Sequence, residues 1–462
     1  MALWDPITQC GSYVITKALV YSGYILFLMH KFLAYLSSLW ITTALSASLA
    51  FLFQTSLARL LTPKTLGEFN STLVYLLFFG AMAGFGADNA LLKIFGKGTR
   101  YGNKHGLSII YYATLTTLIS FVLLILVTYL LFPNMNLSNL VILSPTLLAL
   151  TSFNIQSAIL QIEGKYHQLG TLQIFNNGMK LSCLSFIYFG IASNNDIYYV
   201  YSLSSMFIFL LSIKSFIRLY KGNILKDRIY SSKGNIERMK RISITAIPFG
   251  LASIAHTVYF QCVIFLLSYL SEPEMAGLYS VAFNIIIATY LFPAIIYQKI
   301  LLPKIHRWSN IEPKKVLAIY QVGNGMMLTI GLLISVTIAY FSDQIISIFF
   351  GEQYKQAATY LSLLAICIPI RFLISGLDTI LSTGNLIKYK LYCMLTVAVI
   401  NAALNVIFIP IFSIYSTIFI AILSEILLLT LFLTVIYFKL YGKNTFKNWF
   451  CFSTVVKNIS NN

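Results

Sequence analysis

The sequence predicts an all-α integral membrane protein, with about twelve transmembrane helices in two six-helix lobes related by a pseudo-two-fold axis along the membrane normal. Three observations predict this fold class: the composition, the spacing of long apolar segments, and a turn motif that occurs once in each half. The chain has 462 residues, of which 58% are hydrophobic and only 10% charged, and its mean hydropathy is +0.80. Soluble proteins carry about 25% charged residues, so this composition argues strongly against a soluble enzyme.

Twelve segments are long and apolar enough to cross a bilayer, which takes about 20 residues in a helix. An even number of spans places both ends of the chain on the same side of the membrane. The connections on the opposite side are short, and we expect no extramembrane domain there. The expected spans are residues 33–57, 69–92, 107–132, 137–161, 169–192, 197–220, 242–270, 276–302, 316–341, 357–381, 388–409 and 413–440.

The distribution of Lys and Arg predicts which side carries the termini. Of the 32 basic residues, 27 fall in segments on the side of the termini, three fall on the opposite side, and Lys180 and Arg371 fall inside spans. Cytoplasmic loops of membrane proteins are enriched in Lys and Arg, so we expect both termini in the cytoplasm. We attribute the net charge of +18 to these loops and their contact with anionic lipid, not to nucleic acid.

The chain divides into two lobes with a basic connection between them. We expect an N-lobe at residues 33–220 and a C-lobe at 242–440, joined by a cytoplasmic linker at 221–241. Residues 1–32 are an N-terminal extension: an interfacial helix, a thirteenth span, or sequence upstream of a true start at Met29. Residues 441–462 are expected to form a cytoplasmic tail at the membrane interface, because they mix aromatic residues with lysines.

The pattern Pro-x-x-x-Gly-x-aromatic, called the turn motif below, occurs twice, 210 residues apart. Its first copy has Pro63 and Gly67 after span one, and its second has Pro273 and Gly277 after span seven. Because six spans make up each half, both copies face the outer side. This is the pattern of parallel repeats around an axis along the membrane normal, which enclose a central cavity. We expect the two turns to shape the gate of that cavity.

Cysteine and histidine residues show no pattern of chemistry. No two cysteines have CxxC spacing, and most fall inside apolar segments, so we interpret them as small buried residues. The histidines show no metal-ligand spacing, and we expect no metal and no cofactor. The cysteines are residues 10, 183, 262, 367, 393 and 451, and the histidines are residues 30, 105, 167, 256 and 306.

Short motifs occur in a fixed order along the chain: Ala58–Leu61 before the first turn motif, then Gly277–Ala282 with Leu302–Lys304, Phe350–Tyr354, Leu381–Gly384, Asn405–Pro410 and Ser424–Glu425. In this order they resemble the polysaccharide-biosynthesis transporters, the Wzx-type flippases of the MOP superfamily. The resemblance covers nearly the whole chain and implies a MOP-type fold that works by alternating access. One departure is midway along span seven, where many relatives carry an acidic residue and this chain has Gln261–Val263, and this puts cation coupling through such a carboxylate in doubt.

Five charged residues inside or near spans are candidate substrate contacts, because a charge at mid-bilayer costs about 2.5–3.5 kcal/mol on insertion scales. Lys180, Arg371 and Glu425 lie at the middle of spans five, ten and twelve, and Lys299 lies near the cytoplasmic end of span eight. Asp378 follows Arg371 by two helical turns, about 10 Å along one face. Their functional interpretation is a cationic cavity for a diphosphate. The structural interpretation, for Arg371, Asp378 and Glu425, is pairing or hydrogen bonding between helices.

The sequence therefore favours a flippase that moves an undecaprenyl-diphosphate-linked oligosaccharide, such as an O-antigen or capsule repeat unit, across the bacterial inner membrane. We expect no enzyme activity, and as partners the lipid-linked oligosaccharide, membrane lipids and other polysaccharide-assembly membrane proteins. One alternative is a membrane polymerase or ligase, which needs a substantial outer loop that this chain lacks. Another is a multidrug or metabolite exporter of the same superfamily, whose cationic substrates suit buried cations poorly.

Overall fold

The computed structural model describes residues 41–193, 196–224, 236–302, 304–305, 308, 312–383 and 386–450. Helices make up nearly all of this part of the chain, and it contains no strand. The predictions for the N-terminal extension at 1–32, for most of the linker at 221–241 and for the end of the tail lie outside the described residues.

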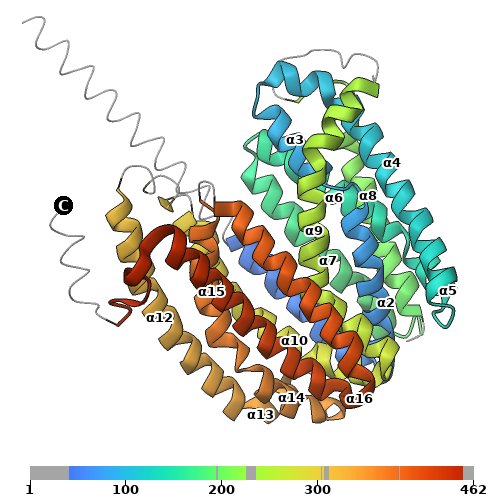
Figure 1. Cartoon of the computed structure of the whole chain (residues 1–462). Helices are drawn as coiled ribbons and strands as arrows, with labels where there is room; N and C mark the ends of the chain where they lie inside the picture. The colour runs from blue at the N-terminus through green and yellow to red at the C-terminus, as the bar shows by residue number, and fades with distance from the viewer. Residues whose placement is uncertain are drawn as a thin grey trace, which may run out of the picture.

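The first half of the chain is built from one helix after another with short connections (Figure 1). Pro63 begins α2, a position where the missing N–H of proline has no helical partner to lose. The helices are Ile41–Leu60, α2 (Pro63–Met82), α3 (Ala87–Phe95), α4 (Thr99–Leu131), α5 (Leu137–Leu143), α6 (Pro145–Ile162), α7 (Tyr166–Tyr188) and α8 (Ile197–Tyr220).

The second half follows the same plan, and Pro273 begins α10 as Pro63 begins α2. Its helices are α9 (Ile236–Leu270), α10 (Pro273–Ala294), the π-helix η2 (Ile295–Leu301), α12 (Pro313–Tyr340), α13 (Ser342–Phe349), the 3₁₀-helix η3 (Glu352–Tyr354), α14 (Gln356–Leu364), α15 (Cys367–Leu381) and α16 (Ile387–Ile436). The short helices η5 (Tyr437–Tyr441) and η6 (Gly442–Phe446) follow α16.

Among the described residues, nine helices are long and apolar enough to cross a membrane, or ten when the bent pair α14 and α15 counts as one span. Two further predicted spans also coincide with helices. One is α7, which is 23 residues long but holds several polar side chains. The other is the second part of α16. This element consists of two helices divided at Ser413, whose φ of 48° interrupts the helical backbone. From residue 41 onward, each predicted span therefore has its helix.

Two breaks inside spans have local causes. Gly84 and Gly86 take φ angles of 70° and 74°, which glycine adopts without steric cost, and they separate α2 from α3. Between α14 and α15 the chain bends by 42°, just before Pro369 in the first turn of α15. At each break the helix axis changes direction, and the helices on both sides of it remain in the membrane-spanning bundle.

The two lobes meet at one end and separate at the other (Figure 1). At the end that carries Pro63 and Pro273, the motif end, α2 packs against α10, and one hydrophobic core holds Phe69 of α2 together with Val281 of α10. Toward the opposite end, the linker end, where α8 ends and α9 begins, the described residues form a separate large core in each lobe and a small further cluster in the first lobe. The helix α9 joins the two lobes, since it packs against α2 and α4 as well as α16.

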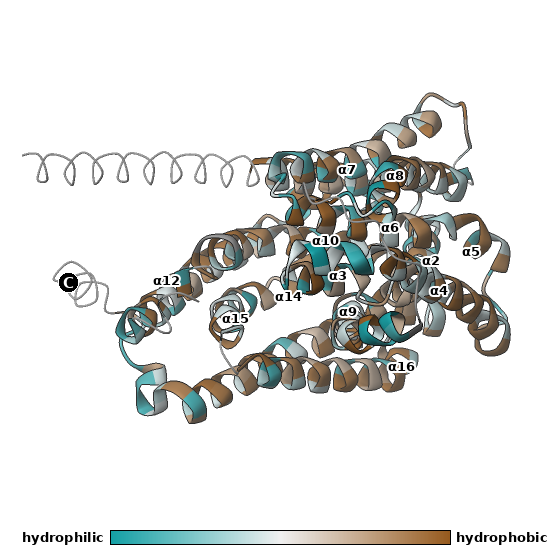
Figure 2. Cartoon of the chain, turned by 90° about the horizontal axis from the view of Figure 1, so that it is seen from above, coloured by the Kyte–Doolittle hydropathy of each residue, from teal (hydrophilic) through white to brown (hydrophobic). Residues whose placement is uncertain are grey.

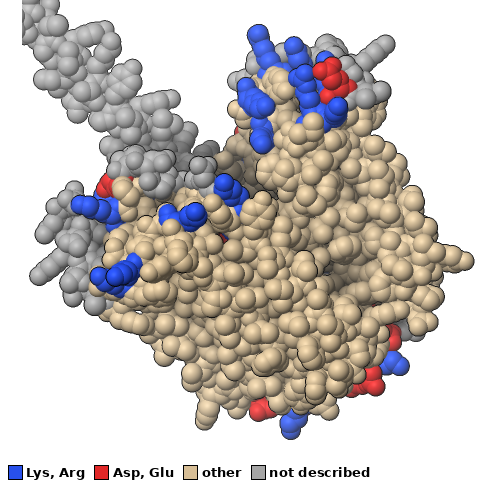
Figure 3. Space-filling model, in the orientation of Figure 1, with Lys and Arg blue, Asp and Glu red and all other residues tan. Residues whose placement is uncertain are grey.

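The outer surface suits a lipid environment. Large apolar side chains such as Val122, Tyr129 and Val336 are between 61% and 75% exposed, so they face outward from the bundle. Figure 2 shows hydrophobic residues along most of the helices. In Figure 3, Lys and Arg gather at the linker ends of both lobes and leave a wide uncharged band between them and the motif end. The protein is therefore a multi-pass membrane protein.

Candidate substrate site and the contact between the lobes

The two turn motifs lie against each other. A Cβ atom added to Gly67 would stand 1.7 Å from the carbonyl oxygen of Pro273, and one added to Gly277 would stand 2.0 Å from that of Pro63. Next to this contact, the Asn70 side chain donates a buried hydrogen bond of 2.9 Å to Ser280, its counterpart 210 residues on. We call this reciprocal contact of α2 with α10 the seam. Only glycine allows the two backbones to approach so closely.

Hydrogen bonds to helix ends add a second contact at the motif end. The last carbonyl groups of a helix have no partner within it and need one elsewhere. Arg59 donates from Nε to the carbonyl oxygen of Phe349 at 3.1 Å, at the end of α13. In return, Gln353 donates to the carbonyl oxygens of Ala58 and Leu61, at 2.9 and 3.1 Å, where the first helix ends. Each lobe thus caps a helix of the other.

Lys180 lines a cavity of about 350 Å³ between the lobes. The walls come from the first helix, α2, α7 and α8 on one side and from α10 on the other. The Nζ atom of Lys180 lies 5.2 Å from the centre of the Tyr201 ring. The amide side chains of Asn177, Gln54 and Asn284 line the same cavity. Among the described residues, no carboxylate lies within ion-pair distance of Lys180. The cavity therefore offers a cation and several amides to a ligand.

Arg371 lies in a different place, buried inside the second lobe. Its Nη2 is 2.9 Å from Oε1 of Glu425, and both side chains are about one-tenth exposed. The guanidinium carbon lies 4.7 Å from the ring centre of Phe260, 5.4 Å from that of Tyr290 and 5.5 Å from that of Tyr259. The Tyr259 hydroxyl also donates to Glu425 at 3.4 Å. Arg371 is thus held by a carboxylate and three aromatic faces.

Of the other two predicted charges, Asp378 has an ion-pair partner, and Lys299 is placed by its backbone alone. Asp378 forms an ion pair of 2.7 Å with Lys390, whose Nζ also donates to Ser382 at 3.0 Å. Lys299 lies in the π-helix η2, but its side chain is outside the described part. The pairing of Arg371 with Glu425, and of Asp378 with Lys390, is the arrangement that the structural interpretation predicts.

The helix α10 lies between the two candidate sites. Asn284, Ile287 and Leu291 line the cavity of Lys180, whereas Tyr290 lies over Arg371. The structure therefore does not bring Lys180 and Arg371 into one cavity wall. The amide residues of this cavity were not among the predicted substrate contacts, although amide side chains inside apolar spans indicate a polar cavity.

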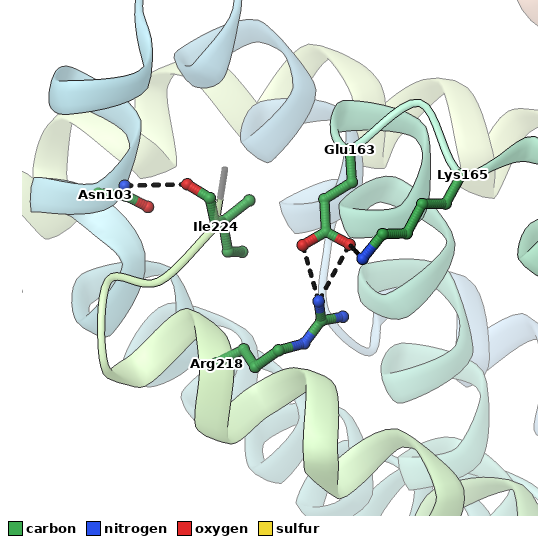
Figure 4. A network of polar contacts seen from close by, with 5 residues as sticks. All are labelled: Asn103, Glu163, Lys165, Arg218 and Ile224. Atoms are coloured by element: carbon green, nitrogen blue, oxygen red, sulfur yellow. Dashed lines mark hydrogen bonds and ion pairs between the residues drawn. The ribbon is translucent and has the colours of Figure 1, made fainter. Parts of the chain in front are cut away.

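At the linker end of the first lobe, the carboxylate of Glu163 links the end of α6 to α8 through an ion pair (Figure 4). Glu163, just after α6, contacts Arg218 of α8 at 2.7 Å and Lys165 at 2.9 Å. Burial alone would raise the pKa of the Glu163 carboxyl, but the hydrogen bonds and charges of Lys165 and Arg218 outweigh it, so its pKa lies below the ordinary value. Nearby, Asn103 donates to the carbonyl oxygen of Ile224 at 3.1 Å.

Comparison with known sequences places most of the chain in one family. Residues 33–309 match the family described as polysaccharide biosynthesis protein, and residues 248–407 match the family described as MatE. No curated protein matches the chain.

Solved structures confirm the predicted fold class. A lipid II flippase MurJ in an inward closed conformation is similar at a TM-score of 0.69 and 16% identity, over 86% of this chain and 87% of that chain. An inward-facing multidrug resistance MATE family transporter of the MOP superfamily is similar at a TM-score of 0.65 and 12% identity, over 84% of this chain and 93% of that chain. At such identities the similarity establishes the fold, a MOP-type pair of six-helix lobes.

Proposed function

Because the chain belongs to the polysaccharide biosynthesis protein family, we propose that it is a flippase for an undecaprenyl-diphosphate-linked oligosaccharide, an O-antigen or capsule repeat unit, in the bacterial inner membrane. At the coarser level it is a membrane transporter of the MOP type. The solved structures described above are a lipid II flippase and a multidrug resistance transporter, which favours transport over the polymerase or ligase alternative.

The observation that carries this proposal is the position of Lys180. A diphosphate needs a cation that is not already neutralised, and Lys180 faces a cavity between the lobes without a carboxylate partner among the residues that the structure describes. The amide of Asn284 can complete the site by donating to a phosphate oxygen, whereas the amide nitrogen of Asn177 already donates to the carbonyl and hydroxyl oxygens of Ser46. Since its walls belong to both lobes, this cavity would change shape when the lobes move against each other.

The closed seam indicates the state in which the protein would load its substrate. The lobes touch at the motif end through Gly67 and Gly277, and they separate toward the linker end. We place the linker end in the cytoplasm, because Lys and Arg gather there. In this arrangement the cavity between the lobes is closed toward the outside. Alternating access then requires the seam to open while the linker ends approach each other.

The remaining predicted residues receive supporting roles in this proposal. Arg371 and Glu425 tie α15 to the part of α16 after Ser413, and Asp378 with Lys390 ties α15 to the part before Ser413. These pairs would keep the second lobe rigid while it rocks. Lys299 lies on η2 near the cytoplasmic end of its span, and its part in substrate binding stays a prediction of the sequence.

Transport by purified protein in liposomes tests the role of Lys180. A fluorescent undecaprenyl-diphosphate oligosaccharide reports leaflet exchange through quenching of the outer leaflet. Since a charged hydrogen bond is worth about 1.5–3 kcal/mol, we expect Lys180→Ala to slow exchange about tenfold or more. Lys180→Arg keeps the charge and should retain most of the activity. As the matched control, Lys64→Ala removes an exposed lysine at the motif end and should leave exchange unchanged.

Full activity of Lys180→Ala would contradict the substrate site. The match to the MatE family supports the exporter alternative as a second candidate. In the same liposomes, uptake of an amphiphilic organic cation with no exchange of the lipid-linked oligosaccharide would favour the exporter and overturn the flippase proposal.

A further inference from the structure

A second cavity lies at the motif end, outside the site of Lys180. It measures about 410 Å³, and its walls come from α2, α5, α8, the loop before α5, the end of α9 and Pro273. Both lobes therefore contribute to it, beside the seam. Nothing in the transport step proposed above uses this cavity.

The polar groups in its walls are amides and hydroxyls rather than basic side chains. Asn134, Asn136 and Asn139 line the cavity, together with Ser71 and Ser268. Amides and hydroxyls carry both donors and acceptors, although Oδ1 of Asn136 already accepts from the backbone and the hydroxyl of Ser138. No Lys or Arg is among the lining residues that the structure describes. The cavity therefore cannot neutralise a diphosphate, but it matches a ligand that carries many hydroxyl groups.

One carboxylate lies in the wall and sets the charge of the cavity. Glu68 on α2 lines it, and Glu272 and Glu274 flank Pro273 on the exposed turn between α9 and α10. A carboxylate accepts hydrogen bonds from sugar hydroxyls, but it repels a second carboxylate. An acidic sugar would therefore be disfavoured.

Aromatic side chains complete the site with fixed faces. The rings of Phe265 and Tyr269 stack at 5.9 Å with an angle of 19° between their planes. Phe132 stands edge-on to both of them, at 5.3 and 4.9 Å. Tyr198 also lines the cavity, and its hydroxyl interacts with Thr72 and Asn139. Rigid aromatic faces beside a few polar groups are typical of small-molecule pockets, and the apolar face of a sugar ring can lie on such a surface.

We propose that this cavity binds a neutral sugar unit of the translocated glycan, such as a hexose or an N-acetylhexosamine, at the outer exit of the transporter. The inference rests on the proposed function. It deepens that function by naming the sugar class. Because the walls belong to both lobes, opening of the seam would break the site and release the glycan.

Binding of soluble glycans to the full-length protein tests the proposal without a transport step. The probes are maltotetraose and chitotetraose as neutral glycans and tetragalacturonate as an acidic one, measured by saturation-transfer NMR on protein in nanodiscs. We expect both neutral glycans to bind and the acidic one to bind at least about tenfold more weakly. Glu68→Gln should bring the binding of tetragalacturonate up toward that of the neutral glycans.

Single variants assign the binding to this cavity. Tyr269→Ala and Asn139→Ala should each weaken maltotetraose binding about tenfold. Tyr340→Ala is the control, because Tyr340 is 76% exposed and does not line the cavity. Equal binding of neutral and acidic glycans, or binding that survives both cavity variants, would overturn the proposal.

Leaflet exchange separates this proposal from the function on which it rests. Exchange of the lipid-linked oligosaccharide by the wild type, with no binding of soluble glycans, would overturn the exit site and leave the flippase proposal standing. Binding that depends on Tyr269, with no exchange in the wild type, would overturn the flippase proposal and the exit role together. We expect Lys180→Ala to lose exchange and to keep soluble-glycan binding.

Discussion

At the residue scale, the pair of Arg371 and Glu425 is a buried ion pair inside the second lobe. The ions are 2.9 Å apart and almost completely buried, so each is the main compensation for the other's lost hydration. The aromatic faces of Tyr259, Phe260 and Tyr290 add favourable contacts with the guanidinium but offer no charge to replace Glu425. A change to one member should therefore be far more harmful than a change to both.

We predict that Glu425→Gln destabilises the protein by about 3–5 kcal/mol, because it leaves a buried guanidinium without its counter-ion. The double variant Arg371→Met with Glu425→Leu should recover most of that loss, because two apolar side chains need no counter-ion. Thermal unfolding in detergent, followed by tryptophan fluorescence, measures both effects. If the double variant folds and still exchanges lipid normally, the pair is structural. A stable double variant without transport would instead make Arg371 a substrate contact.

We expect the folding stability of the first lobe to depend on pH through the carboxyl group of Glu163. Its pKa is lowered by Lys165 and Arg218 against the opposing effect of burial. Since the unfolded value is about 4.3, this ion pair contributes stability at every pH above that value. The contribution is lost as the pH falls through the lower, folded-state value. We predict that Glu163→Gln lowers stability near neutral pH by about 1–2 kcal/mol, and that wild type and variant converge at acidic pH.

Melting temperatures of the two proteins between pH 7 and pH 3 check this prediction. The matched control is Glu237→Gln, which removes an exposed pair with Arg241 at 3.0 Å. An exposed pair of this kind is worth about 0.3–0.5 kcal/mol, so the control should change the melting temperature little. A difference between wild type and Glu163→Gln that persists unchanged at pH 3 would contradict the assignment.

At the scale of helices, the approach of α2 to α10 depends on two glycines. A methyl group at Gly67 would overlap the carbonyl of Pro273, and backbone atoms cannot move aside as a flexible side chain can. We predict that Gly67→Ala prevents the seam from closing and abolishes leaflet exchange, while the protein still reaches the membrane. Labelling of Ser280→Cys by a membrane-impermeant thiol reagent should rise, since Ser280 is only 3% exposed in the closed seam.

The control for this helix contact is Gly178→Ala on α7. The nearest atom to an added Cβ there is a Leu49 methyl at 4.0 Å, so the added methyl group makes an ordinary van der Waals contact without a clash. Unchanged labelling in Gly67→Ala, with normal exchange, would show that the two helices do not need to approach this closely.

The helices were predictable from sequence because a membrane span needs only a long apolar segment. The two turn motifs also indicated equivalent positions in two lobes. That Gly67 lies against Pro273 was not predictable, because a contact across the pseudo-two-fold axis depends on how whole lobes pack. The pairing of Asp378 with Lys390 was hidden for a different reason, because it depends on how α15 and α16 are rotated within one lobe. Local sequence patterns predict where helices lie along the chain, whereas the rotation of each helix in the bundle determines which buried charges face each other.

At the scale of the whole molecule, the distribution of hydrophobic cores suits a movement of lobes. One core joins the lobes at the motif end, and separate cores stabilise each lobe toward the linker end. Opening the seam would leave the two separate cores intact, so each lobe can move as a unit. The helix α9 spans both regions: Ile242 lies in the core of the first lobe and Tyr259 in that of the second. It is therefore the element that must bend or pivot.

This view of the molecule predicts that locking the seam stops transport. Asn70 and Ser280 are in hydrogen-bond contact across it, so Asn70→Cys with Ser280→Cys, with the native cysteines replaced, should cross-link under oxidation. We expect leaflet exchange to stop on oxidation and to return on reduction. Thr146→Cys with Ser205→Cys is the matched control, because these side chains lie 3.0 Å apart within the first lobe. That cross-link should leave exchange unchanged, and a seam-locked protein that still transports would exclude alternating access through the motif end.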